Sequence, residues 1–280
     1  MLPKSFFLSS LLVCGLLSSN ASIAQRIVSI GGTVTEIVYL LGAEGQLVAT
    51  DTSSIYPTAA TQTPKVGYQR TLSAEGVLSV RPETLIITPA AGPKKVLQQL
   101  KETGIKLVTI HADASKQGIL DTVSQVANAL NKKHTGELAN QAIEQAFNQL
   151  SPPKIWSTQA PRLLFVLQMG GAPMVAGQNT GPNALFKIAG AVNAAGSIKG
   201  YKALTPEALL IAQPDAIVVT QQGLAHSGEA AIWGLPGMAT TPAGKAHRII
   251  TMDALLALGL GPRTPSAIQY LYEQLQDWAP

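Results

Sequence analysis

Cysteine is almost absent from this sequence, and charged and aromatic side chains are scarce. The 280 residues include one cysteine, 13% charged residues and 5% aromatic residues. That cysteine, Cys14, lies in an N-terminal apolar run, so a chain cleaved after the run would hold no thiol, no disulfide and no cysteine metal site. The formal net charge is +4, and the basic residues are scattered rather than grouped in a stripe with aromatic partners. This pattern argues against nucleic-acid binding.

The sequence also lacks the common signatures of catalysis. Gly31-Gly32-Thr33 is not followed by a phosphate-loop lysine, and neither His-Glu-x-x-His nor Gly-x-Ser-x-Gly occurs. The four histidines form no pair or histidine-rich loop, so a bare zinc or manganese site is not indicated. These absences favour a binding protein over an enzyme.

The N-terminus has the pattern of a secretory signal peptide. Lys4 supplies a positive charge, residues 6–17 form an apolar run, and Ser22-Ile23-Ala24 is a small-x-small cleavage site. We expect residues 1–24 to be removed and the rest to be soluble, because no later segment approaches the roughly 20 apolar residues of a transmembrane helix. A lipoprotein alternative would need Cys14 as the first residue, and the residue before it is not small.

Strand and helix patterns alternate along the first hundred residues. A β-branched run at 26–30 precedes two glycines and a series of apolar positions at helical spacing that ends at Gly42. Ser73 can cap a short helix, Arg81-Pro82 breaks it, and 84–88 has the pattern of a buried strand. Alternation of this kind predicts a parallel sheet covered by helices.

A long helical pattern separates this region from a second α/β segment. Residues 117–150 contain no proline and carry apolar residues at spacings of three and four, so we expect one long helix, bent near Gly136. Residues 151–153 end it, and a strand at 162–167 opens the second segment. The predicted organisation is a signal peptide at 1–24, an N-terminal lobe at 25–116, a linking helix at 117–150 and a C-terminal lobe at 151–280.

An internal repeat relates the two segments. Residues 72–88 reappear as 204–220, and both copies read cap, acidic first turn, short helix, X-Pro-acid and strand. Upstream, Gly67-Tyr68 corresponds to Gly200-Tyr201 if one residue is gapped. Such a unit can recur in any α/β protein, but two similar lobes account better for the whole pattern. We therefore predict an α/β fold of two Rossmann-like lobes with parallel sheets, joined by one long helix.

The glycine turn at 31–36, the paired Leu-Ser/Thr-x-Glu helices and the single linking helix together resemble the helix-hinged class of periplasmic binding proteins. That class serves ABC importers of cobalamin, ferric siderophores and haem. Residues 65–73 are similar to the segment that carries the axial tyrosine in haem-binding members. Three later stretches are also similar to those members: 233–237, 241–244 and 259–265. The resemblance implies a monomeric periplasmic protein that binds haem as its transported ligand and hands it to a permease dimer in the inner membrane.

The resemblance makes Tyr68 the axial ligand of the haem iron. A phenolate is a hard anionic donor suited to ferric iron, and tyrosine is a known haem ligand. A free phenol has a pKa of about 10, so it needs help to ionise at neutral pH. Arg70, two residues on, would point the same way in an extended segment and would stabilise the phenolate. Taken alone, a Gly-Tyr-x-Arg loop is more often a packed surface tyrosine.

The second lobe departs from the haem-binding pattern. Some relatives place a histidine from this lobe on the iron, and Met169 is the nearest match here. A thioether favours reduced iron, so Met169 would more simply form an apolar wall against the porphyrin. His226 is an alternative candidate ligand.

Glu75 and Glu207 occupy equivalent places in the two repeats. By resemblance they dock each lobe onto arginines of the permease dimer, one acid for each subunit. An acid in the first turn of a helix is also favoured by the helix dipole alone. The rival function is the same fold binding cobalamin or a ferric siderophore, with Tyr68 stacking on the ligand.

Overall fold

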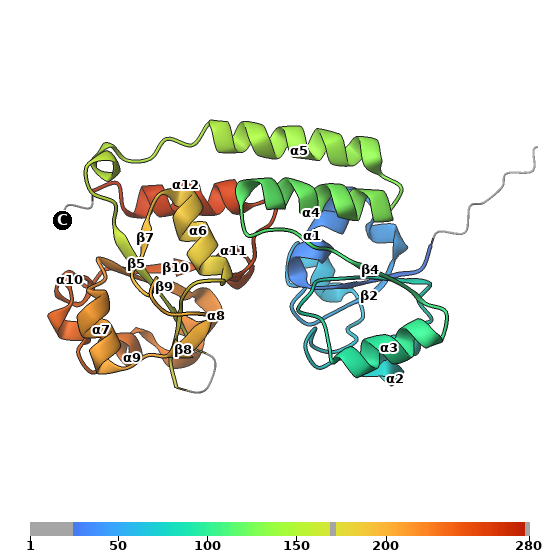
Figure 1. The fold of residues 1–280 in the computed structure, drawn as a ribbon, viewed down its shortest axis with the longest axis horizontal. Coiled ribbons are helices and arrows are strands. Elements are labelled where there is room, and N and C mark those ends of the chain that lie inside the picture. The colour runs from blue at the N-terminus through green and yellow to red at the C-terminus, as the bar shows by residue number, and fades with distance from the viewer. Residues whose placement is uncertain (1–24, 169–171, 278–280) are drawn as a thin grey trace, which may run out of the picture.

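The computed structural model describes residues 25–168 and 172–277, which form two lobes side by side with helices along one edge (Figure 1). The predicted signal peptide, residues 1–24, and the predicted contact residue Met169 lie outside these ranges. Within the described ranges, no helix combines the length and apolar character needed to cross a membrane.

The N-terminal lobe is a parallel sheet covered by helices, as the alternating pattern predicts. Its elements are β1 (Ile27–Ile30), α1 (Gly32–Leu40), β2 (Leu47–Thr50), α2 (Ala74–Leu78), β3 (Thr84–Ile87), α3 (Lys94–Glu102) and β4 (Lys106–Thr109), with 3-10 turns at Glu44–Gln46 and Thr58–Gln62. The strands pair in the order β2-β1-β3-β4, and every pairing is parallel. The central strands β1 and β3 are buried at every position, which is typical of parallel strands covered on both faces.

The C-terminal lobe has a mixed sheet rather than a purely parallel one. Its elements are β5 (Arg162–Leu167), β6 (Met174–Ala176), α6 (Gly181–Ala189), β7 (Val192–Asn193), β8 (Tyr201–Ala203), α7 (Pro206–Ala212), β9 (Ala216–Thr220), α8 (Gln221–Ser227), α9 (Glu229–Trp233), α10 (Pro242–Lys245), β10 (Ile249–Met252), α11 (Ala254–Leu258) and α12 (Thr264–Gln274), with 3-10 turns at Lys154–Ser157 and Met238–Thr240. The order is β10-β9-β5-β6-β8, and β7 also pairs with β5. β6 runs antiparallel to both neighbours. The connection from β5 to β6 is too short for the crossover that a parallel pair needs.

The expected single helix over 117–150 is two helices, so that prediction is wrong in detail. α4 (Lys116–Ala129) ends at Leu130, and α5 (Lys133–Asn148) runs back along it. Asn131 has a left-handed backbone with φ of 56°, and the Lys132 amide donates to the Ala127 carbonyl at 2.8 Å. This pairing is the Schellman arrangement that ends many helices, with asparagine in the place of the usual glycine.

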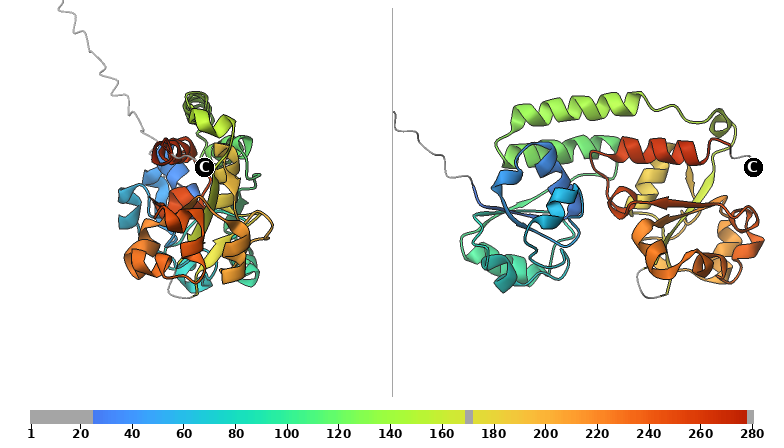
Figure 2. Two further views of the ribbon diagram at one scale, coloured as in Figure 1. Left: turned by 90° about the vertical axis from the view of Figure 1, so that its left-hand side faces the viewer. Right: turned by 180° about the vertical axis from the view of Figure 1, so that it is seen from behind.

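Gly136 does not bend a helix but lets two helices approach. A side chain at this position would lie 2.4 Å from the Ala127 Cβ on α4. The chain then passes from the first lobe to the second through α5, whose length lies along both α4 and α12. Figure 2 shows from behind that the green helices and the red α12 form one layer along the lobes.

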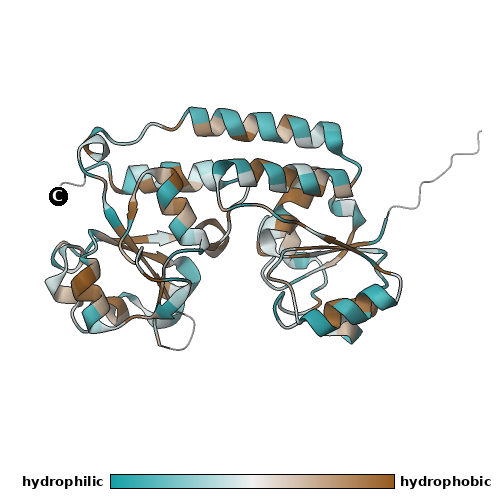
Figure 3. Cartoon of the chain, in the orientation of Figure 1, coloured by the Kyte–Doolittle hydropathy of each residue, from teal (hydrophilic) through white to brown (hydrophobic). Residues whose placement is uncertain are grey.

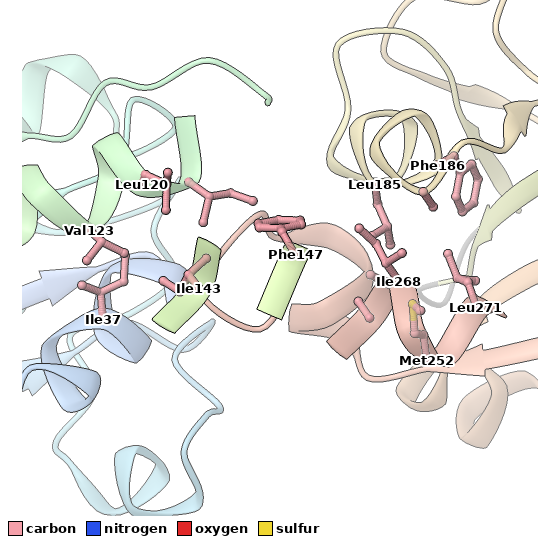
Figure 4. Packing of buried hydrophobic residues seen from close by; sticks show 14 of the residues in the cluster. Ile37, Leu120, Val123, Ile143, Phe147, Leu185, Phe186, Met252, Ile268 and Leu271 are labelled. Carbon is pink, nitrogen blue, oxygen red and sulfur yellow. The ribbon is translucent and has the colours of Figure 1, made fainter. Parts of the chain in front are cut away.

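One hydrophobic core extends from lobe to lobe beneath this layer. Phe147 of α5 lies between Ile143 and Leu120 on one side and Leu185 and Ile268 on the other (Figure 4). Two further clusters fill the opposite faces of the N-terminal and C-terminal sheets. The apolar strands appear as brown arrows inside each lobe in Figure 3.

The internal repeat is confirmed in backbone geometry. Ser73 caps α2 by accepting from the Gly76 amide at 3.0 Å, and Thr205 caps α7 by accepting from the Ala208 amide at 3.2 Å. A left-handed residue follows each helix in the same place of the repeat: Arg81 comes two residues after the C-cap of α2, and Gln213 is the C-cap of α7. The two copies therefore share their fold as well as their pattern.

Candidate functional site

The two sheets approach each other at the carboxyl ends of their strands. Gly32, which begins α1 directly after β1, is so close to Leu255 of α11 that a side chain here would lie 2.8 Å from it. Gly259 and Gly261 approach Thr33 in the same way, at 2.8 and 3.0 Å. Ligands of open α/β sheets bind outside the carboxyl ends of the strands, so the site is sought where the lobes meet.

A buried carboxylate organises the loops at this end of the N-terminal sheet. Asp51, directly after β2, accepts from the Gly31 amide at 2.8 Å and from the Ser53 amide at 3.0 Å. It also accepts from the Gln69 amide at 3.2 Å. The segment that contains Tyr68 is thereby tied to the ends of the neighbouring strands. Neither the composition nor any motif of the sequence predicts that Asp51 organises these loops.

Tyr68 is exposed on a segment whose backbone is fixed. The Val66 amide donates to the Thr50 carbonyl at 3.0 Å, and the Thr52 amide donates to the Gly67 carbonyl at 2.9 Å. Gly67 has a φ of 104°, a conformation that side chains rarely allow, and Tyr68 follows this turn with 42% of its surface exposed. Tyr68 is therefore not a packed interior tyrosine.

The backbone at Arg70 differs from the expectation. The Thr71 amide donates to the Tyr68 carbonyl at 2.9 Å, so residues 68–71 form a turn rather than an extended segment. The argument that alternation aligns Arg70 with Tyr68 is wrong for that reason. Both side chains nevertheless act on the same group, the Tyr201 phenol of the other lobe.

Tyr201, in β8 of the second lobe, responds electrostatically to both Arg70 and Tyr68. Burial raises the pKa of Tyr201, the Arg70 guanidinium opposes this rise, and the Tyr68 phenol adds to it. These influences require the three groups to lie near one another although β8 belongs to the C-terminal lobe. The internal repeat indicates that Tyr201 corresponds to Tyr68, because it aligns Gly67-Tyr68 with Gly200-Tyr201.

A hollow of about 340 Å³ opens at the carboxyl ends of β5 and β9. Its lining includes Leu167, Gln168, Thr220, His226 and Leu258. The buried Gln168 accepts a hydrogen bond from the Ser227 hydroxyl of α8, which fixes one wall. The exposed His226 lines this hollow, as the alternative ligand would require.

The glycine turn at 31–36 and the stretch at 259–265 meet in a partly buried ion pair between the lobes. Arg263, at the start of α12, donates to the Glu36 carboxylate of α1 at 3.1 Å. The Arg263 guanidinium stacks on the Tyr56 ring at 3.4 Å and lies 3.9 Å from Asp253. Burial raises the pKa of Glu36, and Arg263 opposes the rise. The pair fixes the place where the lobes touch.

The two predicted docking acids are exposed on short helices, one in each lobe. Glu75 lies in the first turn of α2, and Glu207 lies in the first turn of α7. A backbone amide and the Thr205 hydroxyl lower the pKa of Glu207, so its carboxylate is ionised at neutral pH. Neither acid takes part in the contact between the lobes.

Comparison with known proteins decides the family. The family described as "Periplasmic binding protein" matches residues 27–256. This chain belongs to the periplasmic binding protein family. Its role is binding for transport rather than catalysis.

Several solved periplasmic binding proteins share this fold. The periplasmic heme-binding protein RhuT from Roseiflexus sp. RS-1, in apo form, is 35% identical, with a TM-score of 0.83, and the match covers 91% of this chain and 98% of that one. The periplasmic heme-binding protein HutB of Vibrio cholerae is 36% identical, with a TM-score of 0.79, covering 90% and 99%. The vitamin B12-binding protein of Vibrio vulnificus strain CMCP6 is 28% identical over 269 residues, covering 95% of each chain.

Proposed function

We propose that this periplasmic binding protein captures haem between its two lobes and delivers it to an ABC importer. The observation that carries the proposal is the exposed Tyr68, held on a tied segment at the carboxyl edge of one lobe and near Tyr201 of the other. Solved relatives at 35% and 36% identity are named as heme-binding proteins.

The side chains present suit haem as a transported ligand. Ferric iron favours the hard oxygen of a phenolate, and coordination to the iron would supply most of the shift that ionisation of Tyr68 needs. Arg70, in the same turn as Tyr68, is proposed as the cation that would favour the charged form of the bound phenol. The mostly apolar hollow by Leu167 and Leu258 would cover a porphyrin face or edge.

The C-terminal lobe would complete the site. Met169 is proposed as an apolar wall against the porphyrin, in keeping with its soft thioether. His226 is the alternative contact from this lobe, since it lines the hollow.

Cobalamin is the second candidate ligand, because the Vibrio vulnificus relative is named as a vitamin B12-binding protein. Titration of the purified chain with ferric haem and, separately, with cyanocobalamin distinguishes the two by fluorescence quenching. Saturable haem binding that cyanocobalamin does not displace supports the proposal. Binding of the corrinoid without haem binding refutes it.

Delivery would require docking of Glu75 and Glu207 onto the permease dimer of the importer, with the protein acting as a monomer. Glu75→Ala combined with Glu207→Ala should leave ligand affinity unchanged and abolish import. Loss of ligand binding would contradict the docking role.

Export would require cleavage of residues 1–24 after Ala24, which leaves the two lobes and the helices between them in the periplasm. The mass of the protein purified from the periplasm tests this directly. A mass that begins at Gln25 is expected, and a lipid-modified Cys14 would contradict it.

A further inference from the structure

An exposed leucine follows each of the two acids by one helical turn. Leu78 of α2 has 39% of its surface exposed, and Leu210 of α7, its partner in the repeat, has 52%. The residue just before each leucine, Val77 or Leu209, is fully buried beneath its helix. Each short helix therefore presents one carboxylate and one large apolar side chain to solvent.

An arginine at the start of the first strand holds each of these helices in the same way. Arg26, just before β1, donates through Nη2 to the Val80 carbonyl at 2.7 Å. Arg162, at the start of β5, donates through Nη2 to the carbonyl of Ala212, the repeat partner of Val80, at 2.8 Å. Such bonds fix the carboxyl end of each helix, so the acid and the leucine have the same setting in both lobes.

The positions of the helices also suit a common partner. Figure 1 shows α2 and α7 in the lower parts of the two lobes, away from α4 and α5. One copy in each lobe matches a partner that presents two equivalent sites, as a two-fold symmetric dimer does. A carboxylate suits a cationic group on such a partner, and an exposed leucine suits an apolar pocket beside that group.

We propose that Leu78 and Leu210 are docking residues, each of which enters an apolar pocket next to the cation that pairs with Glu75 or Glu207 on a permease dimer. This proposal rests on the proposed importer role and adds to it the apolar half of each contact. Charge alone sets orientation, whereas a buried leucine adds affinity that salt does not screen.

The C-terminal lobe offers the larger apolar contact. Ile211 has 77% of its surface exposed, whereas its repeat partner in the N-terminal lobe is Ser79. An apolar groove of about 140 Å³ lies beside Ile211, between α7 and the residues around Ala194 and Ile198. Figure 3 shows α7 as a largely hydrophobic helix at the surface. We expect the C-terminal contact to be the stronger of the two.

Docking is measured without ligand, as binding of the apo chain to its permease and ATPase complex in lipid nanodiscs. Leu78→Asn should raise the dissociation constant about tenfold, and Leu210→Asn with Ile211→Asn should raise it more. Added salt should weaken the wild type and these leucine variants by the same factor, because the lost contact is apolar. The matched control is Leu40→Asn with Leu138→Asn, two leucines of similar exposure, 45% and 51%, on α1 and α5.

Wild-type affinity in the docking variants, or an equal loss in the control, would overturn the proposal. A chain that docks through its leucines but binds no haem would support the docking surface and refute the haem assignment. A chain that binds haem but shows no docking at all would refute both the leucine contacts and the importer role.

Discussion

The two lobes share one repeated unit and differ in what surrounds it. The cap, helix, left-handed residue and strand recur at α2–β3 and α7–β9, with an arginine holding each helix. The N-terminal sheet is entirely parallel, whereas the C-terminal sheet gains the antiparallel strands β6 and β8. The shared unit suits the proposed docking, which would be needed once per lobe. The added β8 carries Tyr201, whose pKa responds to Tyr68, so the differing part suits the proposed ligand site.

The largest expected loss of stability comes from a substitution in the core that connects the two lobes. Phe147→Ala removes the α5 ring that packs between side chains of both lobes, and it should lower the free energy of unfolding by about 3–5 kcal/mol. Urea denaturation followed by circular dichroism measures this. Phe186→Ala, in the part of the same core that belongs to the C-terminal lobe, is the control, and only Phe147→Ala should separate the unfolding of the lobes into two transitions.

We expect a smaller loss of stability when either of the two arginines that hold α2 and α7 is removed. Arg162 is half-buried and Arg26 is exposed, so Arg162→Ala should cost about 2 kcal/mol of stability and Arg26→Ala about 1 kcal/mol. Thermal unfolding of the single variants gives both values. No cost in either variant would contradict the view that the same bond holds each helix, and equal costs would contradict the larger contribution expected of the half-buried Arg162.

The pH dependence of stability tests the contact between the lobes. Because burial raises the folded-state pKa of Glu36 above its usual 4.5, its stabilising contribution is complete below that value and is lost as the pH rises through the folded pKa. Glu36→Gln should remove this pH-dependent loss. Denaturation between pH 4 and 8 measures it, and an unchanged profile in the variant would contradict the assignment.

We expect the smallest loss of stability when the side-chain cap of α2 or of α7 is removed. Ser73→Ala and Thr205→Ala each remove a side-chain bond to a helix amide, so each should cost about 1 kcal/mol. Chemical denaturation of both variants should give costs that agree within error, with the Ser73→Thr variant close to wild type.

The sequence was sufficient for the lobes, the repeat and the short helices, because caps, breakers and apolar periodicity are local signals. It was not sufficient for the turn at Asn131, because an asparagine can stand within a helix or end one, and the packing of α5 against α4 that Gly136 permits is not a local signal. The sequence also could not predict the pairing of Glu36 with Arg263. Those residues are far apart in the chain, and only the meeting of the lobes brings them together.

The same contrast between local and distant signals holds for the proposed site. Tyr68 stands in a motif, and the structure leaves it exposed. Tyr201 corresponds to Tyr68 only through the gapped repeat, and its place in the fold depends on the antiparallel pairing of β6 and β8. The turn at residues 68–71 could not be read from alternation, because a turn and an extended segment share the same residues here.

The visible spectrum of the ferric haem complex tests the central claim most directly. The wild type should show a Soret band and the high-spin charge-transfer band of a phenolate ligand, and Tyr68→Phe should lose that band and bind at least tenfold more weakly, a change of about 1.4 kcal/mol. Tyr39→Phe, on α1, should behave as the wild type. An unaltered spectrum and affinity in Tyr68→Phe would contradict the assignment of Tyr68 as the ligand of the iron.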